Sequence, residues 1–393
     1  MNILFLMKVY EVGGQEVVTS TLAHSFLLHG HRISIASFKP ANNIMRSRTD
    51  NQVHFYTLGD FKCSNEQISK LRDILRKEQI DIVINQWGLP YIPIKVLNEA
   101  KKGLDIKIIS IYHNSPDSNA RIKGVEIAID QCTNPLKKII LKGKKEIFHQ
   151  ITKRSMRYVY SHSDLYMVLS SSFVEKFKDF TSIQKPDKLI VQTNPVTISS
   201  KDFKYKKENK QKEIIYMGRI DYNQKRVYRV IDIWQELESK YPDWRLTIVG
   251  DGPERKNLEQ KANILNLQHI KFEGFQAPES YYKRASILIL TSEYEGFPLV
   301  LAECMSFGVI PVVYGSYSAV YDIIKHKTNG IIIKPQNRVF PQEDMVKQLS
   351  ALMENEELRD KMAQAAIKTS NEDYSLESIY QSWERIFYQL IQK

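Results

Sequence analysis

Residues 286–314 read SILILTSEYEGFPLVLAECMSFGVIPVVY, and this stretch decides the fold class. The apolar runs at its two ends are strand-like, and the segment LVLAECMSFG between them predicts a helix that ends at Gly308. Strand, helix and strand in this order predict a βαβ unit of a parallel sheet. Glu295 and Glu303 lie where the first strand passes into the helix, and a carboxylate beside a buried strand is costly without a partner. The segment that joins them is therefore either a solvated loop or a loop that holds a ligand.

The same alternation of apolar runs and helical patterns extends over nearly the whole chain. The first half has seven strand-like runs, at 2–7, 32–38, 53–58, 81–86, 107–113, 164–170 and 188–193. The second half has six, at 213–218, 245–250, 270–274, 286–291, 309–314 and 330–334. Only loop and helix pieces are expected between 115 and 150. We predict an α/β protein with two doubly wound, Rossmann-like domains that face a cleft.

The polar, Lys-rich stretch TISSKDFKYKKENKQKE at 197–213 has no periodicity and is the best linker candidate. It places an N-terminal domain at 1–196 and a second domain at 197–374. The last stretch, 375–391, carries apolar residues at helical spacing and should be packed. In doubly wound domains, ligands bind beyond the carboxyl ends of the strands.

Composition limits the class of protein. The chain has 393 residues, 42% of them hydrophobic and 26% charged, which is typical of a globular protein with two domains. It has no apolar run of the length that spans a membrane, and its N-terminus has no signal-peptide pattern. Its three cysteines show no metal-binding or disulfide spacing. A cytoplasmic setting is expected.

The positive charge is concentrated in the first half. Residues 1–197 hold 28 Lys and Arg against 18 Asp and Glu, whereas residues 198–393 hold 28 against 27. The densest stretch, at 135–160, interleaves lysines and arginines with aliphatic and aromatic residues. It fits an anionic membrane surface, an anionic acceptor or nucleic acid, and a solvated helix face explains it equally well.

Several polar residues follow the predicted strands. Gly13 and Gly14 lie between the first strand and a helix, where glycines allow close approach to an anion, although a tight turn explains them as well. His113 follows a strand and is either a ligand or a structural histidine. Arg219 and Lys225 lie on the loop after the first strand of the second domain, where such cations suit a diphosphate, and surface solvation explains them equally well.

The loop at 292–303 complements these cations. A helix that begins near Pro298 would direct its free amides toward an anion next to Glu295. Carboxylates accept hydrogen bonds from paired hydroxyls, so the arrangement suits a ligand with sugar hydroxyls at both ends and phosphate between them. A nucleotide sugar is such a ligand.

These pieces together resemble the retaining glycosyltransferases of family four, which have the GT-B fold. The resemblance covers nearly the whole chain and is strongest over about 213–313. It is carried by GG at 13–14, His113, GRIDYNQK at 218–225, VGDGPE at 249–254, FEG at 272–274 and EGFPLVLAE at 295–303, the E-x7-E motif. Lys225 lies seven residues after Gly218 where the family commonly has six, and Pro298 stands where Gly is often found.

The resemblance implies a role for each matching residue. Glu303 would hold the ribose hydroxyls and Glu295 the hydroxyls of the donor sugar. Arg219 and Lys225 would neutralise the diphosphate, with Gly14 closing on it from the first domain. His113 would lie near the transferred sugar, and the C-terminal helix, 375–393, would return to the first domain. Backbone amides around Phe297 to Val300, those of Phe297, Leu299 and Val300, would support ribose and phosphate. Gly13, Gly296 and Pro298 would also lie at the donor.

The implied activity is a metal-independent hexosyl transfer with retention, from a nucleoside-diphosphate sugar, with UDP favoured, to a hydroxyl of a glycan or lipid-linked acceptor. Surface polysaccharide or glycolipid synthesis is the expected setting, with peripheral contact to the inner face of the membrane through 135–160. No cofactor and no nucleic-acid partner are expected. The E-x-E of Glu293 and Glu295 lacks further metal ligands. The alternatives are a sugar phosphorylase, a nucleotide-sugar epimerase, and a non-catalytic glycan-binding or partner subunit.

Overall fold

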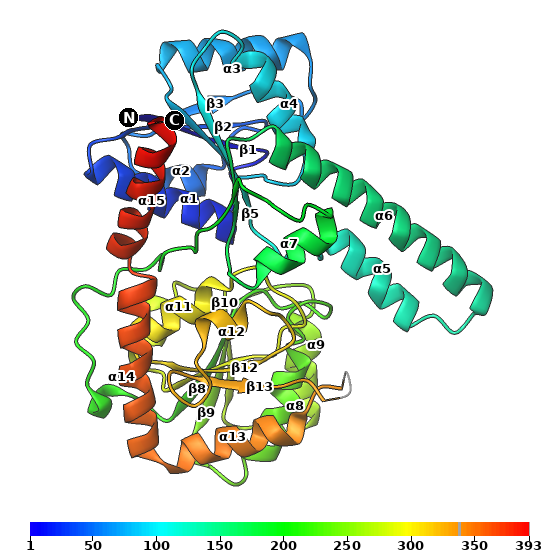
Figure 1. Cartoon of the computed structure of the whole chain (residues 1–393). Helices are drawn as coiled ribbons and strands as arrows, with labels where there is room; N and C mark the ends of the chain where they lie inside the picture. The colour runs from blue at the N-terminus through cyan, green and yellow to red at the C-terminus, as the bar shows by residue number, and fades with distance from the viewer. Residues whose placement is uncertain (337–338, 393) are drawn as a thin grey trace. The chain divides into compact units, whose positions relative to one another are not determined.

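The computed structural model describes residues 1–336 and 339–392, which form two compact units. The first unit comprises Met1–Pro195 and the chain from Leu376 on, and the second comprises Val196–Ser375. Each unit is built around one parallel sheet with helices between its strands (Figure 1). The predicted α/β class with two Rossmann-like sheets is confirmed.

The sheet of the first unit has seven parallel strands in the order β3-β2-β1-β4-β5-β6-β7. They are β1 (Asn2–Met7), β2 (Arg32–Ser37), β3 (His54–Thr57), β4 (Ile82–Asn85), β5 (Lys107–Tyr112), β6 (Leu165–Val168) and β7 (Leu189–Val191). Every strand-like run predicted in this half forms a strand. The strand order reverses between β1 and β4, which makes this pair the topological switch point, where open α/β sheets bind ligands.

The helices of the first unit include the C-terminal one. They are α1 (Gly14–Leu28), α2 (Asn43–Arg48), α3 (Asn65–Lys77), α4 (Tyr91–Ala100), α5 (Ala120–Asp130), α6 (Pro135–Ser161), α7 (Phe173–Thr181) and α15 (Leu376–Ile391). Helix α15 packs on α1, where the rings of Trp383 and Phe387 lie 5.8 and 5.3 Å from the ring of Phe26. The return of the C-terminal helix to the first unit is thereby confirmed.

The region between 115 and 150, where the sequence predicts only loop and helix pieces, forms most of a helical hairpin. Helices α5 and α6 run side by side and extend away from the sheet of the first unit (Figure 1). Lys145 of α6 and Lys123 of α5 both pair with Glu126, each at 2.9 Å, so a shared carboxylate joins the two helices.

The second unit repeats the architecture with six parallel strands in the order β10-β9-β8-β11-β12-β13. The strands are β8 (Glu213–Met217), β9 (Arg245–Val249), β10 (Ile270–Gly274), β11 (Ile287–Leu290), β12 (Ile310–Tyr314) and β13 (Ile331–Ile333). The helices are α8 (Tyr228–Leu237), α9 (Arg255–Ile264), α10 (Glu279–Arg284), α11 (Leu299–Ser306), α12 (Val320–Ile323), α13 (Gln342–Glu354) and α14 (Glu356–Asp373). Here the strand order reverses between β8 and β11.

The Lys-rich stretch at 197–213, predicted as the linker, directly follows the boundary between the two units at Pro195 and Val196. It belongs to the second unit, against which polar contacts hold it along its length. The Tyr205 hydroxyl donates to Asp360 at 3.0 Å, and the Lys210 ammonium donates to the Tyr282 carbonyl at 2.8 Å. Desolvation lowers the pKa of Lys210 to about 7. Composition suggested a linker because the aromatic residues that pack are interspersed with lysines.

Among the helices that the structure describes, none combines the length and apolarity needed to cross a membrane.

Candidate active site

The predicted cation loop and the predicted glutamate loop meet at the switch point of the second sheet. Strands β8 and β11 are hydrogen-bonded neighbours and run parallel, so the loops that follow them leave the same edge. Glu293 N–H donates to the Gln224 carbonyl at 2.7 Å, which fastens one loop to the other. This edge of the sheet is the candidate active site.

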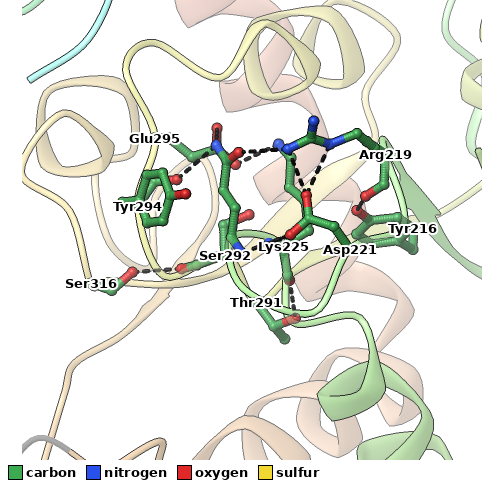
Figure 2. Close-up of polar contacts among 10 residues, drawn as sticks. Tyr216, Arg219, Asp221, Lys225, Thr291, Ser292, Tyr294, Glu295 and Ser316 are labelled. Carbon is green, nitrogen blue, oxygen red and sulfur yellow. Dashed lines mark hydrogen bonds and ion pairs between the residues drawn. The ribbon is translucent and has the colours of Figure 1, made fainter. Parts of the chain in front are cut away.

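A largely buried ion pair lies at its centre. The Lys225 ammonium is 2.5 Å from Glu295 Oε1, and the two side chains are 15% and 8% exposed (Figure 2). The second oxygen of Glu295 accepts a 3.3 Å hydrogen bond from the Gln224 amide. Because a buried charge without a partner costs several kcal/mol, each member of the pair holds the other in position.

Asp221 and Gln224 build the loop that carries the cations. Asp221 Oδ1 accepts the backbone N–H groups of Gln224 and Lys225 at 2.7 and 3.2 Å, while its Oδ2 accepts from Arg219 Nε at 2.9 Å. Gln224 in turn accepts from Arg219 Nη2 at 3.2 Å and donates to the Tyr294 carbonyl at 3.1 Å. One aspartate and one glutamine thus position both cations and the following loop.

Arg219 differs from Lys225 in its access to solvent. Its side chain is 63% exposed, and the contact with Asp221 orients the guanidinium beside the buried pair (Figure 2). A guanidinium has five N–H donors in a planar fork, so donors remain for a ligand after those used by Asp221 and Gln224. This geometry suits an anionic oxygen that approaches from solvent.

Three hydroxyls near this edge are buried without a hydrogen-bond partner among the described residues. They belong to Ser292, which follows β11, and to Tyr317 and Ser318, which follow β12. Burial, together with the nearby Glu295 charge, raises the pKa of Tyr317 well above its usual range. Buried polar atoms are normally paired, so three unpaired hydroxyls beyond the ends of the neighbouring strands β11 and β12 indicate a place where a polar ligand completes the bonding.

Glu303 is more enclosed than the sequence suggests. Its side chain lies inside the second unit, and its two oxygens accept hydrogen bonds from Thr197 at 2.5 Å and Tyr282 at 3.3 Å. Burial raises the pKa of this carboxyl. Helix α11 begins at Leu299 after Pro298, as predicted, and Phe297 packs 5.6 Å from the Tyr374 ring. The ribose contact predicted for Glu303 remains a prediction.

Glu293 takes no part in a common site with Glu295. It pairs with Arg229 at 3.0 Å, and the Arg229 guanidinium lies 4.4 Å from the centre of the Phe340 ring. Each glutamate of the E-x-E therefore has its own cation. No group of three or more His, Cys, Asp or Glu side chains with the arrangement of a metal site occurs in the part of the chain that the structure describes.

The remaining predicted residues lie together at the switch point of the first sheet. Gly13 and Gly14 form the turn from β1 into α1, and Gln15 of that helix donates to the Gln86 carbonyl at 2.9 Å. The Gln86 side chain meets His113 Nε2 at 2.7 Å. Desolvation lowers the pKa of His113 to about 4, so its imidazole is neutral at physiological pH.

Four residues that support these sites have no distinctive pattern in the sequence. Asp221 and Gln224 lie within the quoted GRIDYNQK segment but have no spacing that distinguishes them from turn residues. Gln86 and Tyr317 follow strands, and this position is the one feature of the sequence that marks them.

Family comparisons agree with this arrangement. The model for glycosyl transferases group 1 matches residues 197–369, and that for Glycosyltransferase Family 4 matches residues 12–199. The two matches follow each other along the chain and correspond to the two units. The chain belongs to the family-four glycosyltransferases. It is thus a glycosyltransferase, and its fold is GT-B.

Relatives of this glycosyltransferase match along its full length. An uncharacterized glycosyltransferase of Haemophilus influenzae is 28% identical over 97% of this chain and 98% of its own. The Campylobacter jejuni enzyme named GalNAc-alpha-(1->4)-GalNAc-alpha-(1->3)-diNAcBac-PP-undecaprenol alpha-1,4-N-acetyl-D-galactosaminyltransferase is 24% identical over 98% of each chain. Among solved structures, Anabaena HepE in complex with UDP has a TM-score of 0.74 at 16% identity and covers 99% of this chain and 100% of its own, which confirms the fold.

Proposed function

We propose that this glycosyltransferase moves a hexose from a nucleoside-diphosphate sugar to a hydroxyl of a glycan or lipid-linked acceptor. UDP is the proposed nucleotide, and surface polysaccharide or glycolipid synthesis in the cytoplasm is the proposed setting. The bond from the anomeric carbon to the diphosphate breaks, the acceptor oxygen takes its place, and the nucleoside diphosphate leaves.

The buried Lys225–Glu295 pair beside the exposed Arg219 is the observation that carries the proposal. As the sugar departs, negative charge grows on the diphosphate, and preorganised cations that face this charge lower the barrier. Arg219 has free donors for a bidentate phosphate contact, and Lys225 supplies a charge that its neighbours hold in position. Glu295 fixes Lys225 and keeps lone pairs for a sugar hydroxyl.

The three unpaired hydroxyls extend the proposed sugar site. Ser292, Tyr317 and Ser318 would donate to or accept from the hydroxyls of the transferred sugar, on the side of Glu295 formed by the ends of β11 and β12. A site built to pair with sugar hydroxyls rejects an analogue that lacks one, because its own buried groups are then left unpaired. These residues are candidates for the choice of sugar.

The nucleotide side of the proposal rests on Glu303 and the start of α11. A carboxylate has about four lone-pair positions, and Thr197 and Tyr282 use two of those on Glu303. A ribose hydroxyl would add to these contacts or replace that of Thr197. The amides that begin α11, at Leu299 and Val300, would support ribose and phosphate.

We propose that residues of the first unit add contacts to the donor. The glycine turn at Gly13 and Gly14 leads into the N-terminus of α1, where free amides favour an anion. His113 would meet the transferred sugar as a neutral imidazole. Its Nε2–H donates to the Gln86 side-chain oxygen, which leaves Nδ1 as an acceptor for a sugar hydroxyl.

Solved relatives support UDP as the nucleotide. Anabaena HepE has been crystallised with UDP and with UDP-glucose, and a pneumococcal O-GlcNAc transferase with UDP and GlcNAc. The named relatives include a Salmonella typhimurium lipopolysaccharide 1,6-galactosyltransferase and an enzyme for a PP-undecaprenol-linked glycan. These names support a glycan or lipid-linked acceptor.

A hydrolysis screen with UDP- and GDP-sugars tests the proposed function. We expect the wild type to release UDP from at least one donor, and Arg219→Ala to lower that rate about a hundredfold. Because Arg219 is 63% exposed, its replacement should leave the thermal midpoint within about 2 °C of the wild type.

Lys256→Ala removes another exposed cation, on α9, and serves as the matched control. The proposal fails if no donor is turned over, or if Arg219→Ala and Lys256→Ala behave alike.

Tyr317→Phe tests the sugar site separately. Removing a buried hydroxyl that has no partner should leave stability unchanged or raised, since no protein hydrogen bond is lost. We expect kcat/KM for the preferred donor to fall about tenfold, the effect of one lost hydrogen bond. Steady-state kinetics beside thermal unfolding measures both. An unchanged kcat/KM would remove Tyr317 from the site.

Retention and metal independence follow from the family resemblance and belong to the proposal. We expect the donor's anomeric configuration in the product, measured by proton NMR before the anomers equilibrate. Excess EDTA should leave the rate within about twofold of the untreated enzyme. An inverted product would contradict retention. A rate that EDTA abolishes and Mg²⁺ restores would contradict metal independence.

A further inference from the structure

The α5–α6 hairpin has a face that the fold does not use. The C-terminal half of α6 packs on α4 and α7, with Thr152, Met156 and Val159 buried, whereas the N-terminal half is paired with α5 and extends from the rest of the first unit (Figure 1). The outer side of this N-terminal half is therefore available to a partner.

That outer side is apolar. The five large hydrophobic residues of α6 that are exposed have 53–74% of their surface in solvent, and they are Leu136, Ile139, Ile140, Ile147 and Ile151. We call these five residues the apolar stripe. At about 100° per residue, their spacing places them on one side of the helix, roughly opposite the buried Thr152, Met156 and Val159. Five exposed aliphatic residues in one row are unusual unless something covers them.

Lysines flank the apolar stripe. Helix α6 carries eight Lys and Arg residues against a single acid, Glu146. Lys145 pairs with Glu126 of α5, but Lys137, Lys142 and Lys144 form no salt bridge with any described residue. The helical rotation places Lys137 and Lys144 beside one border of the stripe and Lys142 toward the other.

We propose that the apolar stripe and its flanking lysines dock on an anionic lipid bilayer. Aliphatic side chains would enter the boundary between headgroups and acyl chains, and the lysine stems would extend along them to place the ammonium groups at the phosphates. Each such lysine strengthens partitioning onto an anionic surface roughly fivefold. The helix lies on the bilayer and does not cross it.

Charge and polarity together favour a bilayer over other partners. Nucleic acid would engage the lysines and leave the isoleucines in water. A second copy of this chain, stripe against stripe, would bring the two rows of lysines close together, and this repulsion opposes association. An anionic bilayer satisfies both the apolar and the cationic components.

This proposal does not depend on the proposed function, because membrane docking requires neither a donor nor catalysis. Co-sedimentation of the full chain with sucrose-loaded vesicles tests it, using phosphatidylglycerol mixed with phosphatidylcholine, and phosphatidylcholine alone. We expect binding to the anionic vesicles only, and at least tenfold weaker partitioning for Ile139→Ser/Ile140→Ser/Ile147→Ser. Lys137→Gln/Lys144→Gln should weaken binding roughly thirtyfold at low salt and little at 1 M salt.

The matched controls are Ile264→Ser, an 83% exposed isoleucine on α9, and Lys240→Gln/Lys256→Gln in the second unit. Both should bind like the wild type. The proposal is overturned if anionic vesicles do not bind the wild type or bind no better than phosphatidylcholine. It is also overturned if the isoleucine variant binds like the wild type, or if sedimentation velocity shows a dimer that this variant dissociates.

Discussion

Glu295→Gln is expected to lower turnover of the preferred donor by a hundredfold to a thousandfold, the usual range for a group that stabilises developing charge. The substitution keeps the size of the side chain and removes its charge. Lys225, 15% exposed, then has no counterion, and its ammonium is free to shift from the position that Glu295 sets at 2.5 Å. The loss should appear in kcat, since the cation acts on charge that grows in the transition state.

The same substitution should also destabilise the second unit. An unpaired charge in a largely buried position costs about 3 kcal/mol, and the thermal midpoint should fall accordingly. The double variant Lys225→Met/Glu295→Gln removes both charges and should recover most of this stability. Its turnover should stay at the level of the single variant. The double variant would then be nearly as stable as the wild type while its turnover stays low, a combination that a merely structural ion pair would not produce.

Glu293→Gln is the matched control, because Glu293 lies two residues away and also pairs with a cation, Arg229. We expect this variant to lose some stability and to keep turnover within about threefold of the wild type. If Glu293→Gln and Glu295→Gln lower kcat equally, the pair has no catalytic role and the effect belongs to the loop as a whole.

Gly250→Ala is expected to destabilise the second unit by about 3 kcal/mol or more, enough to abolish soluble expression in a marginally stable protein. Gly250 follows β9 with φ +143°, a backbone conformation that residues with a Cβ rarely adopt. A Cβ built there would lie 1.8 Å from the Gly218 carbonyl oxygen. The backbone would have to move, and it is the backbone that leads into the Arg219 and Lys225 loop.

Gly124→Ala provides the opposite case. Gly124 lies on α5, and a Cβ added there meets no atom within 4 Å apart from its chain neighbours and the backbone of its own helix. Alanine in an exposed helix position should raise stability by about 0.5–1 kcal/mol. Urea unfolding of both variants measures the contrast. A Gly250→Ala variant as stable as the wild type would show that the close approach of Gly250 to the Gly218 carbonyl tolerates a side chain.

The sheets could be predicted from the sequence because parallel strands buried on both faces are nearly continuous apolar runs. The runs at 2–7 and 287–290 have this character, and every such run is a strand. The α5–α6 hairpin could not be predicted in the same way. Its helices do not bury a regular stripe against a core, and the isoleucines of α6 face solvent, so the usual amphipathic pattern is absent.

The site could be predicted only in part. Arg219, Lys225 and Glu295 follow strands within motifs of distinctive spacing, and the structure brings these three together. Gln224, which contacts both Arg219 and Glu295, is an ordinary polar loop residue in the sequence, and its role depends on the meeting of two loops about 70 residues apart. The enclosure of Glu303 by Thr197 and Tyr282 likewise depends on tertiary packing.

The central claim is that the end of β8 and β11 binds a nucleoside diphosphate through Arg219 and Lys225. Calorimetric titration of the intact chain with UDP and GDP tests it most directly, since it requires no acceptor and no knowledge of the sugar. We predict that UDP binds the wild type. Its affinity should fall about tenfold or more in Arg219→Ala and about a hundredfold when the Lys225→Met/Glu295→Gln replacement is added. If neither nucleotide binds the wild type, or if all three proteins bind the nucleotide with equal affinity, the account is contradicted.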